Sequence, residues 1–255
     1  MTPRALALLV LAALGASASA QDRYLPTGLS VRLTGGVGGH GLGDLAAWQR
    51  FEQAVVADAE IALAETAAFP AAPSVGVEVG YLGARWNRRR DIRYEVGLAA
   101  GVEATAGRLH YADYSGDFAV DRRARRVLLG AYAEHEAGHM LGAWVGLRLD
   151  LRASPTAVTY RRGVVLGGEP FETAEVGFRA VPLSAEPAVV AERALGGRLR
   201  LRARVGYEVS TRPDLGTAPG GLPETARWAG GVGPRVGWGG FRAGVGLAAR
   251  LSGGG

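Results

Sequence analysis

The feature that most constrains this chain is a strict alternation of apolar and charged residues, clearest over residues 197–211, GRLRLRARVGYEVST. The apolar residues of this stretch are separated by Arg200, Arg202 and Arg204. A period of two residues is that of a β-strand, whose successive side chains point to opposite faces of the sheet. One face of this strand is therefore apolar, and the other carries the arginines.

Most of the chain repeats this alternation. We expect ten strands, with eight as the nearest alternative, in residues 29–38, 74–81, 92–103, 127–133, 141–152, 197–209, 227–238 and 241–251, and in two less regular stretches within 157–182. The 40 glycines among the 255 residues disfavour a helix-rich architecture, whereas glycine is common where strands bend or line a crowded interior. We therefore expect an all-β fold.

The N-terminus predicts export. Residues 1–20 contain Arg4, an apolar run up to Leu14, and small residues at Ala18 and Ala20, which is the pattern of a signal peptide cleaved before Gln21. No later segment holds the ~18 uncharged apolar residues that a membrane helix needs, so any membrane crossing must be made by strands. The chain has no cysteine, which excludes disulfides and thiolate zinc sites.

An alternating sheet behind an export signal is similar to the small outer-membrane β-barrel proteins of Gram-negative bacteria, over residues 22–255. The resemblance implies an antiparallel transmembrane up-and-down barrel of about ten strands, formed by residues 21–255 and located in the outer membrane. It implies outer-membrane lipid, lipopolysaccharide and the barrel-assembly machinery as partners. The chain departs from the family pattern at its end, where SGGG follows Leu251 in place of a terminal aromatic residue.

One segment changes period. In residues 44–65, apolar side chains recur every three or four positions at Leu45, Trp48, Phe51 and Val55, which predicts an amphipathic helix with Asp44 as its N-cap. We expect this helix to be an insertion in a long loop of the barrel. It would plug the lumen, cover its mouth or lie on the membrane surface.

The face opposite the apolar one is expected to line the lumen with a network of charged side chains. This network comprises Glu78, Arg93, Glu95, Glu103, Arg148, Asp150, Arg152, Arg179, Arg200, Arg202, Arg204, Glu208, Arg235, Arg242 and Arg250. Side chains nearly fill the interior of a barrel of eight strands, and ten leave only a little more room. We therefore expect a structural or interaction role, or a narrow pore weakly biased toward anions.

Aromatic residues are expected to form a girdle at the membrane boundaries: Trp86, Tyr94, Trp228, Trp238 and Phe241. Trp228 and Trp238 stand at the two ends of one expected strand. Ten residues tilted by about 40° climb roughly 25 Å, the height of the apolar band between two girdles.

The arginine-rich segments at residues 87–91 and 121–126 are expected at the barrel rims. Arginines there would meet lipid phosphates or lipopolysaccharide. We expect no nucleic-acid binding, because no aromatic residues are interleaved with these arginines.

The rival interpretation is a secreted zinc metalloprotease that uses His135, Glu136 and His139. Two histidines four residues apart on a helix bind zinc on one face, with the glutamate activating water. The third histidine of such proteases would fall at Val145, so that ligand is missing. The flanking residues alternate, which predicts instead a hairpin with its turn at residues 136–138. We therefore expect no bound metal, no cofactor and no enzymatic activity.

Overall fold

The structure is a computed structural model that describes residues 28–39, 41–42, 44–58, 65–67, 69–87, 90–112, 116–140, 142–166, 168–196, 198–217 and 235–252. The signal peptide expected at residues 1–20 lies outside the described residues, as does Trp228. The elements are β1 (Gly28–Gly38), α2 (Asp44–Asp58), β2 (Glu65–Ala67), β3 (Ala72–Asn87), β4 (Arg90–Ala112), β5 (Gly116–Met140), β6 (Ala143–Ala153), β7 (Thr156–Leu166), β8 (Glu169–Ala180), β9 (Leu183–Gly196), β10 (Leu199–Ser210), β11 (Gly216–Thr217) and β12 (Gly240–Ser252).

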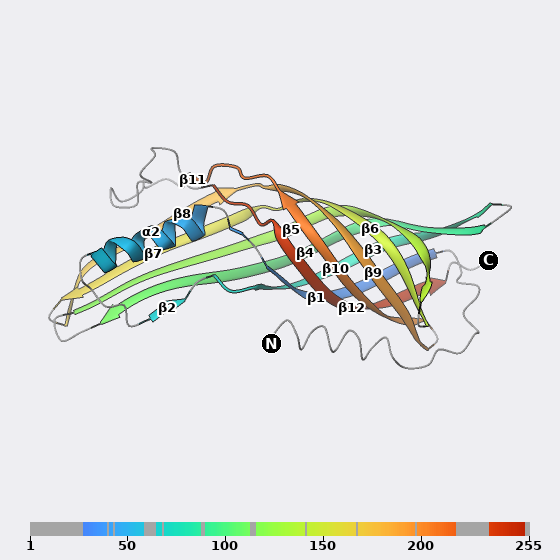
Figure 1. Ribbon diagram of the computed structural model, residues 1–255, viewed down its shortest axis with the longest axis horizontal. Helices are drawn as coiled ribbons and strands as arrows, with labels where there is room; N and C mark the ends of the chain where they lie inside the picture. The colour runs from blue at the N-terminus through green and yellow to red at the C-terminus, as the bar shows by residue number, and fades with distance from the viewer. Residues whose placement is uncertain are drawn as a thin grey trace.

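Eight of these strands close into an antiparallel barrel (Figure 1). The ring runs β5-β6-β9-β10-β12-β1-β3-β4, and β4 pairs again with β5. The first and last strands of the chain meet within it, with Gly28 opposite Ser252. The barrel architecture expected from the alternation is confirmed. The ring has eight strands, which was the alternative prediction, and the expected number of ten was wrong.

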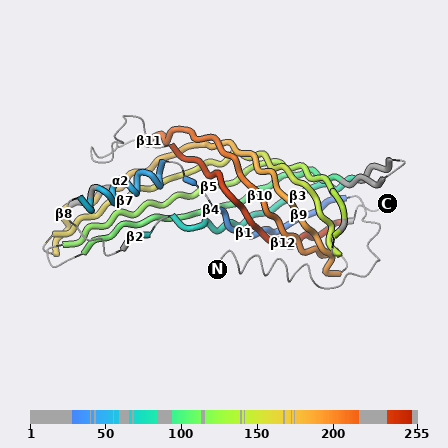
Figure 2. The backbone as a smooth tube through the Cα atoms, in the orientation of Figure 1, coloured from blue at the N-terminus to red at the C-terminus, as the bar shows by residue number. Residues whose placement is uncertain are grey.

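The count differs because two strands are longer than the barrel. β4 has 23 residues and β5 has 25, and Figure 2 shows both running beyond the barrel. Residues 129–140 of β5 pair with β6, and residues 116–126 pair with β7, which in turn pairs with β8. We call the sheet formed by residues 103–112 of β4, residues 116–126 of β5, and β2, β7, β8 and β11 the extension. β7 and β8 alternate like barrel strands but belong to the extension.

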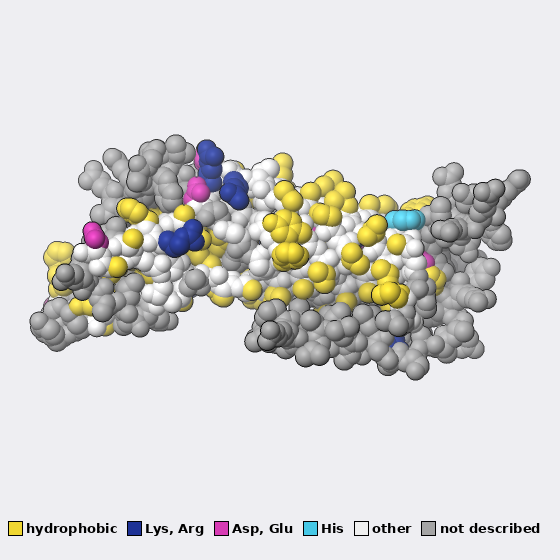
Figure 3. Space-filling model, in the orientation of Figure 1, with side chains coloured by type: hydrophobic (Ala, Val, Ile, Leu, Met, Phe, Trp, Pro, Cys, Tyr) yellow, Lys and Arg dark blue, Asp and Glu magenta, His cyan; other side chains and the backbone are white. Residues whose placement is uncertain are grey.

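The barrel wall separates side chains by polarity. Most outward Val and Leu side chains are exposed, with exposed fractions among these from 36% at Val245 to 68% at Leu98. The inward side chains are largely charged and buried, and Asp150 and Glu208 are 0% exposed. On the face shown in Figure 3, hydrophobic side chains spread over the barrel, while Arg, Asp and Glu side chains gather mainly over the extension.

The helix α2 packs on the extension and not in the lumen. The Trp48 ring stacks on Tyr160 of β7 with centroids 5.0 Å apart, and it meets Phe178 of β8 edge-on at 6.4 Å. Phe51, expected on the same apolar face, is 53% exposed. The helix ends at Asp58, before the expected residue 65, and β2 begins at Glu65. Within the described residues, no helix is both long and apolar enough to cross a membrane.

An apolar cluster lies between α2, the extension and the segment before β12. It contains Leu45, Trp48, Val236 and Trp238, and the last two are 0% exposed. Trp238 donates a hydrogen bond from Nε1 to Oγ1 of Thr156 at 3.0 Å. Its assignment to the girdle is therefore wrong, because this side chain is in a protein core. Residues 227–234 of the strand expected at 227–238 lie outside the described residues. At Arg235 the structure has an isolated β-bridge to Asp214 in place of a strand.

The segment carrying His135 and His139 is part of a β-hairpin, as the alternation predicted. β5 continues to Met140, and the chain turns at Gly142, whose φ of 77° favours glycine. The turn expected at residues 136–138 is wrong. The pairing shifts there by a bulge between Glu136 and Gly138, and the strand then continues.

Candidate functional site: a charge-filled lumen

The lumen collects most of the charged residues predicted for it. Those it brings together are Glu78, Glu95, Glu103, Arg148, Asp150, Arg152, Arg200, Arg202, Arg204, Glu208, Arg242 and Arg250. Their inward direction follows from the alternation of each ring strand. Arg179 does not belong to this set, because it is exposed on β8 of the extension, and Arg235 is exposed and paired with Asp214 outside the barrel. The side chain of Arg93 lies outside the described residues.

At the end next to the extension, two arginines and two glutamates form a closed square. Arg126 donates to Glu103 at 2.9 Å and to Glu208 at 2.7 Å, and Arg242 pairs with the same two carboxylates. The Arg126 guanidinium also lies 4.6 Å from the centre of the Trp238 ring. The apolar cluster therefore rests directly on the charged lumen and covers it at this end.

The middle of the barrel is bridged by arginines that each hold more than one carboxylate. Arg148 binds Glu78 at 2.7 Å and Asp150 at 2.6 Å. Arg152 pairs with Asp150 at 3.0 Å and also with Glu186. The buried charges of Arg148 and Arg152 are thus compensated by carboxylates of their own strand, of the neighbouring β9 and of β3 across the lumen, which burial of ions requires.

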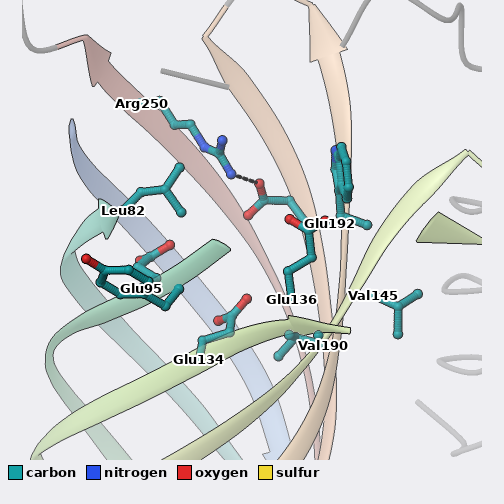
Figure 4. A pocket seen from close by; sticks show the side chains of 11 residues that line it. Leu82, Glu95, Glu134, Glu136, Val145, Val190, Glu192 and Arg250 are labelled. Carbon is teal, nitrogen blue, oxygen red and sulfur yellow. Dashed lines mark hydrogen bonds and ion pairs between the residues drawn. The ribbon is translucent and has the colours of Figure 1, made fainter. Parts of the chain in front are cut away.

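At the opposite end of the lumen, a pocket is lined by four glutamates and one arginine (Figure 4). Arg32 pairs with Glu95, and its other nitrogen is 3.4 Å from Glu78, which joins this end to the middle. Arg250 pairs with Glu192, as the dashed line in Figure 4 shows. The ion pairs therefore run without interruption along the barrel.

Two glycines make room for the buried side chain of Tyr132 in the lumen. A Cβ at Gly80 would lie 2.2 Å from the tyrosine hydroxyl, and one at Gly97 would lie 2.6 Å from its ring. The hydroxyl donates to Glu95 at 2.7 Å and accepts from Arg32 at 2.8 Å. The inward glycines noted in the sequence thus have a packing reason at these positions.

Little space is left inside. The three lumen cavities found among the described residues have volumes of about 40 Å³ each. Such a cavity holds about one or two water molecules and no solute. The larger cavities lie on the outer surface of the molecule.

Sequence reasoning missed several charged residues of the lumen: Arg32, Arg126, Glu134, Glu186 and Glu192. The signal for Arg32 was present, since it lies between Val31 and Leu33 in an alternating strand. Arg126 was assigned to a rim turn because arginines dominate residues 121–126. That segment is strand, and it sends Arg122 and Arg126 to the inner face.

A further buried arginine fixes α2 to the extension. Arg122 of β5 pairs with Glu52 and lies 5.0 Å from the Trp48 ring centre and 5.5 Å from that of Tyr160. Burial lowers the pKa of Arg122 to about 10, so its guanidinium still carries a charge at neutral pH. The cation close to both stacked rings holds the helix over the inner face.

The remaining predictions have mixed outcomes. Tyr94 and Phe241 face outward near opposite ends of the barrel, 43% and 70% exposed, as a girdle requires. The Trp86 and His139 side chains lie outside the described residues. In an extended strand, positions 135 and 139 are roughly 13 Å apart, compared with about 6 Å along a helix. Within the described part of the chain, no group of three or more His, Cys, Asp or Glu is arranged to hold a metal ion.

Fold and lumen together define a class of protein: an eight-stranded antiparallel β-barrel with an apolar outer wall and a charge-filled interior. No protein-family model and no curated protein matches the sequence. Among solved structures, the chain is similar to the crystal structure of Neisserial surface protein A (NspA). The two share 15% sequence identity with a TM-score of 0.32, over 88% of this chain and 96% of that chain. A likeness of that size carries no functional argument.

Proposed function

We propose that the chain is an outer-membrane β-barrel protein with a closed lumen and a structural or interaction role. The observation that carries this proposal is the inverted polarity of the barrel. Buried ion pairs fill its interior, and Val and Leu cover its outside. A water-soluble domain places these residue types the other way round. Hydrocarbon outside and a polar interior are the surroundings that such a wall fits.

The two ends of the barrel support an orientation. Connections of two residues join β3 to β4, β5 to β6 and β9 to β10 at the end where β1 begins and β12 ends. The other end carries α2, the extension and the long connection between β10 and β12. Bacterial barrels have short turns on the periplasmic side and long loops outside the cell. We therefore assign the extension to the cell exterior.

The density of the ion-pair network favours the closed barrel over the narrow pore. An eight-stranded barrel is just wide enough for its side chains, and here these are bonded across the lumen. The zinc protease is not favoured, because its histidines need helical spacing and their segment is a strand. We accordingly propose that the protein is not an enzyme, and we leave its extracellular partner unassigned.

Planar-bilayer recording tests the closed lumen. We expect no conductance steps from purified protein whose gel mobility changes on heating, a sign of a folded barrel. Discrete steps would contradict a closed lumen and favour the pore. Cell fractionation tests the location, since recovery as a soluble periplasmic protein without heat-modifiable mobility would overturn the membrane assignment.

A further inference from the structure

A large groove lies on the outer surface where barrel and extension meet. Its volume is about 710 Å³, and it forms where β5 changes its neighbour from β6 to β7. At this point the amide of Val127 donates to the carbonyl of Pro155 at 2.9 Å. Most of its lining residues face outward, and the buried Glu103, Arg126 and Thr156 also contribute to the lining.

The register arranges the groove in two rows across the strands. The row on the barrel side is apolar and consists of Val75, Val102 and Val127, each paired with the next. These side chains are 43–52% exposed and belong to the apolar outer wall.

The next row outward consists of Ala104, Arg125, Ala157 and Arg179, again paired one with the next. Alanine on either side of Arg125 leaves the space of the groove, because only a methyl group stands above the sheet there. One strand, β7, separates the arginines, so their backbones are two inter-strand spacings, roughly 10 Å, apart. Ala157, the small residue between them, lines the same groove as both arginines.

These two arginines differ from those of the lumen. Within the part of the chain that the structure describes, neither Arg125 nor Arg179 takes part in an ion pair or a hydrogen bond. Arg126, adjacent in sequence on the inner face, is held by two glutamates. Farther out on the same face, Arg108 pairs with Asp121 at 3.3 Å. An uncompensated pair of cations thus lies at the edge of the apolar wall.

We propose that this groove binds one membrane lipid with an anionic phosphate headgroup. An acyl chain lies along Val75, Val102 and Val127, and the phosphate lies over Ala157 between Arg125 and Arg179. Arginine forms paired, charge-assisted hydrogen bonds with phosphate oxygens, which fits two arginines that line one groove on either side of Ala157. The inference rests on the proposed membrane location and adds a specific lipid site to it. With the extension outside the cell, that lipid belongs to the outer leaflet.

Native mass spectrometry of the full chain in detergent, titrated with phosphatidylglycerol, tests the site. We expect one retained lipid, with Kd raised roughly 10- to 100-fold when Arg125→Gln and Arg179→Gln are combined. The matched control combines Arg50→Gln and Arg212→Gln, which removes the same charge from exposed positions elsewhere. An equal loss in that control would mean general attraction and would overturn the site.

Three further arms separate the parts of the proposal. Ala157→Trp keeps both cations but fills the space between them, so it should abolish retention; unchanged retention would overturn the groove. Diacylglycerol, which has no phosphate, and inorganic phosphate, which has no acyl chain, should each bind far more weakly than phosphatidylglycerol. Equal binding of either would overturn the lipid assignment. Heat-modifiable gel mobility, measured for each variant and the native chain, shows separately whether the barrel is folded.

Discussion

Arg126 occupies the position where the charged lumen meets the apolar cluster. It is buried and bonded to Glu103 and Glu208. We expect Arg126→Met to lower the free energy of unfolding by roughly 3–5 kcal/mol, because it leaves buried carboxylates short of a cation. Denaturant unfolding in lipid vesicles, followed by tryptophan fluorescence, measures the change.

A control variant and a double variant test the interpretation of that result. Arg123→Met removes an arginine from the exposed face of the same strand and should change the free energy of unfolding by less than about 0.5 kcal/mol. Combining Arg126→Met with Glu208→Gln should recover part of the loss, because the charges of the cluster then balance again. A cost at Arg126 no larger than at Arg123 would contradict the importance of the square of ion pairs.

At the residue scale, alternation was sufficient to predict most of the lumen. It identified Glu78, Asp150 and Arg202 because each stands between apolar neighbours that face outward. It could not show that Arg179 belongs to the extension, since a strand outside the barrel alternates in the same way. The ion-pair partners of these residues could not be predicted from local alternation either. Arg126 and Glu208 are 82 positions apart and meet only because the ring closes.

At the element scale, α2 should be separable from the barrel. Trp48 is 4% exposed and provides the stacking contact with Tyr160. We expect Trp48→Ala to cost the local attachment of α2 about 3–5 kcal/mol and to accelerate proteolysis within Asp44–Asp58. The heat-modifiable mobility of the barrel should not change. Limited proteolysis followed by mass spectrometry measures the cleavage rate.

Phe51→Ala is the matched control in the same helix. Its side chain is 53% exposed, so cleavage within α2 should stay at the native rate. If Trp48→Ala and Phe51→Ala behaved alike, the packing of α2 on the extension would be wrong. Loss of the folded barrel in the Trp48 variant would contradict its independence from the helix.

The same element shows where a periodic pattern is incomplete as a predictor. A spacing of three or four residues located the helix and its start at Asp44, but it placed Phe51 on the buried face. The sheet beneath α2 contacts a narrow side of it. Among the helix side chains that the structure describes, which do not include Val55, only Leu45, Trp48 and Gln49 are buried. The width of the buried face depends on the partner surface, which no local spacing contains.

At the scale of the whole molecule, the pairing of β6 with β9 decides between eight strands and ten. The two strands pair over ten residues, from Trp144–Glu192 to Ala153–Leu183, and β7 and β8 lie between them in sequence but outside the ring. Since side chains alternate equally in every strand, the sequence carried no sign of which strands leave the barrel. β5 is long enough to pair with β7 along its first half and with β6 along its second half, which allows β7 and β8 to lie outside the ring.

A pair of engineered cysteines tests this pairing directly, because the native chain has none. Leu147 and Val189 are opposite each other on the outer surface. Opposite Cα atoms in antiparallel strands are about 4.5–5.5 Å apart, within the range that a disulfide spans. Leu147→Cys with Val189→Cys should therefore cross-link on oxidation, as shown by mass spectrometry of digested protein. Leu147→Cys with Leu247→Cys, outward residues of unpaired strands, should not.

In a ring of ten, β7 and β8 would separate these two positions by roughly 14 Å, too far for a disulfide. Absence of the Leu147–Val189 cross-link in protein with heat-modifiable mobility would therefore refute the eight-stranded ring. Its presence would place β7 and β8 outside the ring. Those two strands supply Ala157 and Arg179, so the same cross-link decides whether the proposed lipid groove can exist.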